Sequence, residues 1–286
     1  MIILETPVAT RAWADEQRAK GRRIGLVPTM GALHAGHAQL VHEAAQRSDV
    51  VIVSIFVNPL QFNRRDDFEL YPRPIDADIE TCTALGVTAV YAPTAAAMYP
   101  PGFETHVEPG SLADPMEGAS RPGHFRGVST VVAKLFNATR PHVAVFGRKD
   151  FQQLAVISRM VTDLDLGIEI VGLDTVREPD GLAMSSRNRR LTAEQRAAAA
   201  VIPRALTAAA DHRERGQAAM RHAALTVLET EPLARLEYLE IVDPNSLQPP
   251  EDPDADVVVL VAVWLGDVRL IDNRAISAGA TEHARG

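Results

Sequence analysis

Residues Ile24–His37 have the sequence IGLVPTMGALHAGH, and this stretch indicates how the first part of the chain folds. The apolar run Ile24–Thr29 is typical of a short strand that is buried on both faces of a sheet. An amphipathic stretch follows, and we expect a helix to start near His34. A buried strand that leads directly into a helix is the beginning of a βαβ crossover, which joins parallel strands.

The same alternation continues to about residue 175. The run Val50–Val57 is rich in β-branched residues and closes with Asn58-Pro59, which is a break signal. Asp76–Leu85 has helical spacing and ends at Gly86. Further strands are expected at Thr88–Tyr91, His142–Phe146 and Ile168–Leu173. This rhythm predicts the α/β class, with a Rossmann-like parallel sheet.

The pattern changes after about Thr175. Residues 177–181 (REPDG) form a polar, turn-rich break, and Thr192 with Gln195 resembles a capping box that opens an alanine-rich helix broken near Pro203. Strands are expected at Leu236–Val242, Val257–Trp264 and Val268–Ile271, the last two joined as a hairpin at Gly266-Asp267. We therefore predict two domains, residues 1–175 and a smaller α+β domain at 176–286.

Composition excludes several classes of protein. The 286 residues are 46% hydrophobic and 23% charged, which is ordinary globular composition, and the net charge of −8 argues against a nucleic-acid partner. The single cysteine, Cys82, can form neither an internal disulfide nor a cysteine zinc site. The apolar runs fall short of the ~18 residues of a membrane span. The N-terminus carries Glu5 and no basic stretch, so we expect a cytoplasmic protein without a membrane partner.

Ligands of parallel sheets bind beyond the carboxyl ends of the strands, so candidate site residues are those that follow each strand. His34 and His37 follow the first such strand, three residues apart and so on one face of the expected helix, with Gly36 between them. A helix start offers unpaired N–H groups to a phosphate, and a glycine lets the ligand approach the backbone. Surface histidines and a metal site are the alternatives, but the motif supplies only two metal ligands.

Three more polar segments follow predicted strands or the domain break. Asn58 and Gln61 are neutral donors and acceptors that suit a hydroxyl or carboxylate, although such a turn is often only structural. Gly147 permits close backbone approach, and Lys149 is a mobile charge suited to a phosphate. The loop at residues 181–189 brings two hydroxyls and a guanidinium, either as a phosphate-binding loop or as a solvated hinge.

Five motifs occur in order along the chain, and together they are specific. They are P-T-M-G-A-L-H-x-G-H (Pro28–His37), S-I-F-V-N-P-x-Q-F (Ser54–Phe62), R-P-x-H-F-x-G-V (Arg121–Val128), G-x-K-D-x-Q-Q (Gly147–Gln153) and D-G-L-A-M-S-S-R-N (Asp180–Asn188). From Met1 to Ile276 the chain thereby resembles the pantoate–β-alanine ligase family, the pantothenate synthetases. That family belongs to the H-x-G-H nucleotidyltransferases, which are related to class I aminoacyl-tRNA synthetases.

The resemblance implies a two-step reaction in the biosynthesis of pantothenate (vitamin B5) and coenzyme A. ATP and (R)-pantoate give pantoyl adenylate and pyrophosphate, and β-alanine then attacks the acyl carbon to release pantothenate and AMP. Mg²⁺ is expected to accompany ATP through phosphate oxygens and water, with no protein metal ligand assigned. The resemblance also implies a homodimer and a second domain that acts as a lid.

Site residues are carried over position by position. The resemblance implies an ATP site at Met30, Gly31, Ala32, Leu33, His34, Ala35, Gly36, His37, Gly147, Arg148, Lys149, Asp150, Val176, Met184, Ser185, Ser186 and Arg187. Catalytic roles are implied for His37 as the proton donor and for His34, Lys149, Ser185, Ser186 and Arg187 on the phosphates. Pantoate is assigned to Asn58, Gln61, Arg121 and Gln153, and β-alanine to Gln61 and Tyr71.

Two positions depart from the family pattern. The family commonly has an acidic residue where this chain has Arg148, and a tyrosine where it has Phe151. We expect the Arg148 side chain to point away from the γ-phosphate.

Three other functions are weighed against the ligase. An adenylyltransferase for a phosphorylated acceptor shares H-x-G-H but needs a cationic acceptor site. A tRNA-charging enzyme needs an anticodon-reading surface, and an acidic chain of this size offers little basis for one. A protein with a structural metal held by the histidines would contain stoichiometric metal and stay inert with ATP.

Overall fold

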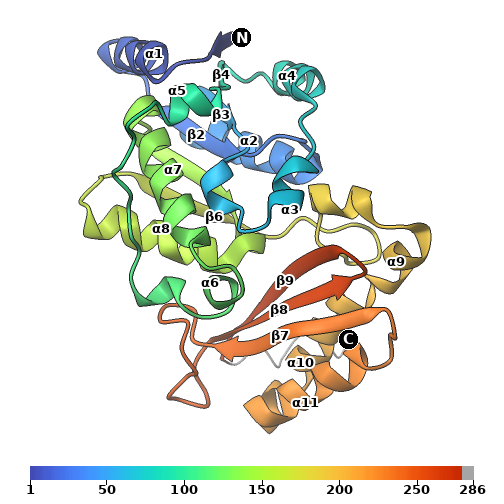
Figure 1. Cartoon of the computed structure of the whole chain (residues 1–286). Helices are drawn as coiled ribbons and strands as arrows, with labels where there is room; N and C mark the ends of the chain where they lie inside the picture. Colours follow the sequence, from blue (N-terminus) through green and yellow to red (C-terminus); the bar gives the residue numbers. More distant parts are fainter. Residues whose placement is uncertain (279–286) are drawn as a thin grey trace. The chain divides into compact units, whose positions relative to one another are not determined.

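The computed structural model describes residues 1–278, in which the chain forms two compact units (Figure 1). The first unit comprises Met1–Arg148 and Gln152–Asp174. The second comprises Lys149–Phe151 and the chain from Thr175 onward.

The first unit is built on a six-stranded sheet in the order β1-β4-β3-β2-β5-β6, and all of its strand pairs are parallel. The strands are β1 (Ile2–Leu4), β2 (Ile24–Thr29), β3 (Val50–Ile55), β4 (Ala89–Tyr91), β5 (Val143–Gly147) and β6 (Glu169–Leu173). Helices connect the strands, as Figure 1 shows for α2 between β2 and β3. The predicted Rossmann-like α/β fold is confirmed.

Helices cover both faces of this sheet. The helices are α1 (Pro7–Ala19), α2 (Ala35–Arg47), α3 (Arg65–Glu69), α4 (Ile75–Ala84), α5 (Ala95–Met98), α6 (Glu117–Ser120), α7 (His124–Thr139) and α8 (Phe151–Asp163), with 3₁₀ turns η1 (Pro59–Gln61) and η2 (Ser111–Ala113). A further 3₁₀ turn, η3 (Arg148–Asp150), has its last two residues in the second unit. Ile24, Leu26 and Ile52 share one buried cluster with α1, α7 and α8. Val27 and Val53 point to the other face and pack with α2. Successive strand residues thus enter two cores, which is why both strands are apolar almost throughout.

The strand order places a topological switch point in the middle of this sheet. From β2 the chain moves outward through β3 to β4, and it then returns to place β5 on the other side of β2. In such sheets the crevice beyond the carboxyl ends of the two strands at the reversal is where ligands bind. Thr29, the last residue of β2, therefore leads the chain into the expected site.

The second unit is a three-stranded antiparallel sheet packed on helices. Its strands, in the order β7-β8-β9, are β7 (Ala234–Val242), β8 (Val257–Leu265) and β9 (Val268–Ile276). Its helical segments are η4 (Ser186–Arg190), α9 (Ala193–Ala198), α10 (Val201–Asp211), η5 (Arg213–Arg215) and α11 (Gln217–Leu228). Val259 and Val261 of β8 share a buried cluster with Leu206 of α10 and Met220 of α11.

Two details of the second unit follow the sequence signals closely. The capping box is present, since Thr192 Oγ1 accepts from the Gln195 N–H at 3.2 Å and Gln195 Oε1 accepts from the Thr192 N–H at 3.0 Å. The predicted break near Pro203 falls between Ala198 and Val201. Pro203 itself lies in the first turn of α10, where its missing N–H costs nothing.

Several elements were not predicted from the sequence; they are β1, α1, α3, α5, α6, α7, α8 and α11. Strand β9 also extends five residues beyond the predicted Val268–Ile271, to Ile276. Within residues 1–278 no helix is both long enough and apolar enough to cross a lipid bilayer.

Candidate active site

The turn after β2 is fixed by a buried carboxylate from α4. The N–H groups of Ala32 and Leu33 donate to the two Asp78 oxygens at 2.8 and 2.7 Å, and Asp78 is only 2% exposed. Ala32 has a left-handed backbone with φ 52°, and Gly31 has φ 81°. A Cβ on Gly31 would lie 2.8 Å from Asp78 Oδ2, so this position needs glycine. The turn is thereby held in one conformation.

His34 and His37 lie side by side at the start of α2, with ring centroids 4.1 Å apart. The structure corrects one expectation: α2 begins at Ala35, so His34 is the N-cap and does not share a helix face with His37. His34 Nδ1 accepts from the Gly36 N–H at 3.1 Å, and His37 Nδ1 accepts from the His34 N–H at 3.2 Å. Each neutral ring therefore carries its proton on Nε2, as a donor.

Asn58 and Gln61 form a buried amide pair after β3. Asn58 Nδ2 donates to Gln61 Oε1 at 3.0 Å and to the Gly127 carbonyl at 3.1 Å, while Tyr99 donates its hydroxyl to Asn58 Oδ1 at 2.8 Å. Gln61 Nε2 lies 3.1 Å from Met30 Sδ, which joins this segment to the turn after β2. The predicted segments that follow β2 and β3 are thus in contact beyond the carboxyl ends of these strands.

Arg121 and His124 hold the main chain of this segment. Both donate to the Gln61 carbonyl, Arg121 from Nη2 at 3.1 Å and His124 from Nδ1 at 2.8 Å. The first turn of α7 also packs closely on η1, because a Cβ on Gly127 would lie 2.2 Å from the Leu60 carbonyl oxygen. Arg121 therefore positions Gln61 as well as being a candidate to touch substrate.

Tyr71 and Gln153 were also predicted to contact substrates. Tyr71 is buried and packs edge to face on Phe62, with centroids 5.7 Å apart. Gln153, on α8, is partly exposed, and its side chain has no hydrogen-bond partner within residues 1–278. Its amide is therefore available to a ligand.

Gln152, the neighbour of Gln153, has a structural role. Its Nε2 donates to the carbonyls of Leu112 and Pro115 at 2.9 and 2.8 Å, and its Oε1 accepts from the Glu117 N–H at 3.1 Å. Gln152 is thus a buried structural side chain, whereas the neighbouring Gln153 is partly exposed.

Arg148, which departs from the family pattern, has its side chain directed along β6. Its Nη1 lies 3.2 Å from Asp174 Oδ1, and a Cβ on Gly172 would lie 3.2 Å from its Nε. Within the described residues, a Cβ on the preceding Gly147 would meet nothing within 4 Å. Space beside the backbone at the end of β5 is therefore not taken up by packing.

Lys149 and Asp150 follow in η3. Lys149 Nζ lies 3.9 Å from Asp150 Oδ1, and the Lys149 carbonyl accepts from Asn273 Nδ2 at 2.8 Å. The Lys149 side chain is 18% exposed, so most of it is buried while part remains reachable.

The predicted loop of the second unit is an ordered turn. Ser185 is the N-cap of η4 and accepts through Oγ from the Arg187 N–H at 3.2 Å. Ser186 is buried. The Met184 N–H donates to the Val176 carbonyl at 2.9 Å, so these two predicted nucleotide contacts are adjacent.

Ion pairs brace the base of this loop. Arg177 makes a bidentate pair with the buried Asp272, at 2.7 and 3.0 Å. Arg196 pairs with both Glu178 and Asp180. Hydrogen bonds from Arg196, joined at Glu178 by one from Asn188, hold the pKa of both carboxyl groups below its usual range.

Sequence reasoning missed Asp78, Tyr99, Gln152 and the Arg177–Asp272 pair. Each of these side chains contacts a segment 40 or more residues away, as Asp78 does Leu33 at a separation of 45 residues. In the sequence Asp78 is one of several acidic residues of the expected helix, and no local signal marks it as buried.

The model of the pantoate–β-alanine ligase family matches residues 2–275. The chain belongs to this family. A pantothenate synthetase of Geobacter sulfurreducens is 47% identical over 276 residues, covering 96% of this chain and 98% of that protein. Pantothenate synthetase 1 of Bradyrhizobium diazoefficiens is 50% identical over 278 residues, with 96% and 98% covered.

Solved structures of the family have the same fold. The pantothenate synthetase of Thermus thermophilus superposes with a TM-score of 0.91 at 43% identity, covering 96% of this chain and 99% of that one. The pantoate–β-alanine ligase of Francisella tularensis, solved with β,γ ATP and β-alanine, has a TM-score of 0.81 at 35% identity and covers 96% and 97%.

Proposed function

We propose that this chain condenses (R)-pantoate with β-alanine in two half-reactions. A pantoate carboxylate oxygen first attacks the α-phosphorus of ATP, and pyrophosphate leaves. The β-alanine amine then attacks the acyl carbon of pantoyl adenylate, loses a proton, and AMP leaves. Family membership across residues 2–275 is the observation that carries the proposal.

The histidine pair suits the first half-reaction. Adenylation needs positioning and charge stabilisation more than covalent help, because charge accumulates on phosphate oxygens. With both Nδ1 atoms engaged by backbone N–H groups, His34 and His37 present Nε2–H donors beside the N-terminus of α2. We assign His37 as the proton donor and His34 to the phosphates, with the Met30–Leu33 turn against the nucleotide.

The amide cluster suits the organic substrates. Gln61 and Asn58 are buried and neutral, so they discriminate by hydrogen bonding without attracting a second phosphate. We assign Gln61, Asn58, Gln153 and Arg121 to pantoate. The β-alanine is assigned to Gln61 and Tyr71.

The remaining nucleotide contacts are assigned to Gly147–Asp150 and to the second unit. We propose that Lys149, Ser185, Ser186 and Arg187 neutralise the phosphates, and that Val176 and Met184 complete the ATP site. The second unit then acts as a lid that keeps water from the acyl adenylate.

Mg²⁺ enters with ATP, because it keeps several waters and binds substrate phosphates in preference to all-protein cages. Within residues 1–278 no group of three or more His, Cys, Asp or Glu side chains is arranged to hold a metal ion, so we assign it no protein ligand. Homodimerisation and a cytoplasmic location stay predictions.

The test is product identity. Pure protein is incubated with ATP, Mg²⁺, pantoate and β-alanine, and the products are identified by mass spectrometry with each component omitted in turn. We expect pantothenate and AMP only in the complete mixture, and pyrophosphate without β-alanine. A stable dinucleotide that forms regardless of β-alanine would instead support an adenylyltransferase.

A further inference from the structure

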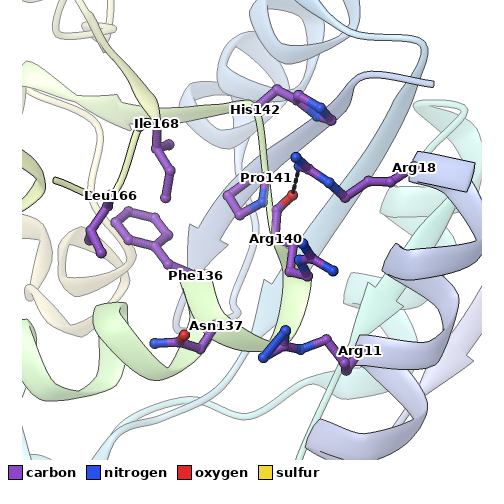
Figure 2. A pocket seen from close by; sticks show the side chains of 10 residues that line it. Arg11, Arg18, Phe136, Asn137, Arg140, Pro141, His142, Leu166 and Ile168 are labelled. Carbon is purple, nitrogen blue, oxygen red and sulfur yellow. Dashed lines mark hydrogen bonds between the residues drawn. The ribbon is translucent and has the colours of Figure 1, made fainter. Parts of the chain in front are cut away.

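Figure 2 shows a pocket of the first unit with a volume of about 240 Å³. It lies at the end of the sheet opposite to the residues that follow β2 and β3 in the candidate active site. Its lining includes His142, directly before β5, and Ile168, directly before β6. The strands of this sheet are parallel, and Thr29 and Asn58 lead away from the carboxyl ends of β2 and β3. The pocket is therefore separate from the site assigned to pantoate and ATP.

Cationic side chains dominate the polar part of the pocket. Arg11 and Arg18 come from α1, and Arg140 follows α7, while none of the ten lining residues is Asp or Glu. The Arg11 side chain has no hydrogen-bond or ion-pair partner within residues 1–278. Arg18 donates one N–H to the Arg140 carbonyl at 2.9 Å, which leaves its other guanidinium donors to solvent.

Arg140 and His142 add further donors. Arg140 ends α7 with a left-handed backbone of φ 45°, a position where glycine is usual, and its side chain pairs with Asp15. His142 Nδ1 accepts from the Ile24 N–H at 2.9 Å, so its neutral ring carries the proton on Nε2. Burial, with Arg18 and Arg23 nearby, lowers the pKa of His142 and favours that neutral form.

The pocket also has an apolar side. Figure 2 shows Phe136, Leu166 and Ile168 together on one side, with the three arginines on the other. Phe136 is buried, and Leu166 and Ile168 are partly exposed. A ligand that fills the pocket thus needs an anionic end and an apolar end.

We propose that this pocket binds a small phosphate monoester whose organic group is apolar. A phosphate dianion offers three acceptor oxygens to guanidinium groups that are arranged as planar forks, and it neutralises two cations at once. The volume lies just below the roughly 300–1,000 Å³ of pockets for drug-sized ligands, which limits the organic group to about the size of one ring. The inference does not depend on the proposed reaction.

Phenyl phosphate is the probe, titrated calorimetrically into the full chain at pH 8 with inorganic phosphate, phenol and phenylacetate in parallel. Phenyl phosphate should bind more tightly than any of the three. Arg11→Ala should weaken the binding of phenyl phosphate about tenfold, which is the loss typical of one charge-assisted hydrogen bond. The affinity of Arg11→Lys for phenyl phosphate should lie between those of Arg11→Ala and the unmodified chain. Raising the salt concentration should weaken binding further.

Arg159→Ala is the matched control. Arg159 lies on α8 outside the pocket, is 66% exposed and pairs only locally with Asp163, so its loss should leave phenyl phosphate affinity unchanged. Because the Arg11 side chain has no partner within residues 1–278, circular dichroism should be native in its variants. Equal affinity in Arg11→Ala and the unmodified chain would overturn the proposal. Phenylacetate binding as tight as phenyl phosphate would overturn the assignment to phosphate.

Discussion

At the scale of single residues, His37 has two functions that a substitution can separate. Its Nδ1 completes the cap of α2 by accepting the His34 N–H, and its Nε2–H is the proposed proton donor. His37→Ala removes both, whereas His37→Gln keeps a capping side chain of the kind found at this helix position. Both variants should release pyrophosphate at least ~10²-fold more slowly, since the imidazole donor is lost in each. Near-normal release from His37→Gln would refute the role of the imidazole.

Asp78 acts on the site through the backbone. Asp78→Ala removes the carboxylate that accepts from the buried N–H groups of Ala32 and Leu33, at a cost of roughly 1–3 kcal/mol per lost acceptor. We expect a lower thermal midpoint and a raised KM for ATP, with a smaller effect on the KM for pantoate. Asp76→Ala is the control, because Asp76 lies in the same turn of α4 but is exposed. Equal changes in the two variants would show that Asp78 does not hold the turn.

At the scale of elements, continuous apolar runs predicted the central strands because both faces of each strand are buried. Strand β9 was cut short at Ile271 because Asp272 and Asn273 look like loop residues, although the buried Asp272 is satisfied by Arg177, 95 residues away. Helix α7 went unpredicted because it is buried around most of its surface and rich in valine and threonine, which blurs the helical period. The histidine pair, Asn58, Gln61 and Lys149 were found from their positions after strands, and Arg121, Tyr71 and Val176 only from the family resemblance. The side chains that hold these segments come from distant parts of the sequence.

The contact between α7 and η1 predicts that a glycine-to-alanine substitution within a helix lowers the stability of the protein instead of raising it. Replacing glycine by alanine inside a helix normally stabilises by about 0.5–1 kcal/mol. Gly127→Ala should instead destabilise, because its Cβ would overlap the Leu60 backbone, and displacement of Gln61 should raise the KM for pantoate. Gly110→Ala is the control, since a Cβ there meets nothing within 4 Å among the described residues. A higher thermal midpoint for Gly127→Ala would mean that the two elements separate easily.

The ion pairs of Arg196 with Glu178 and Asp180 predict that the stability of the protein depends on pH. Arg196 lowers the folded-state pKa of Glu178 and Asp180, so their contribution to stability is present above their unfolded values, near 4, and is lost as pH falls through the folded values. Arg196→Gln should therefore lower the thermal midpoint more at pH 6 than at pH 3. Arg159→Gln removes a charge from a more exposed pair and should show a smaller difference. If Arg196→Gln lowered the thermal midpoint by the same amount at pH 6 and at pH 3, this account would be wrong.

At the scale of the whole molecule, the proposed chemistry and the second core can be separated by one substitution. Met220 of α11 is fully buried in the core formed by α10, α11 and the antiparallel sheet, and no assigned site residue belongs to that cluster. Met220→Ala should lower the free energy of unfolding by about 2–5 kcal/mol, through lost burial and the cavity left behind. Val8→Ala, at an 81% exposed position, is the control and should change stability little. Below the unfolding transition, the kcat per folded Met220→Ala molecule should match that of the unmodified chain. If kcat falls while circular dichroism stays native, then this core sets the geometry of catalysis as well as the stability of the unit.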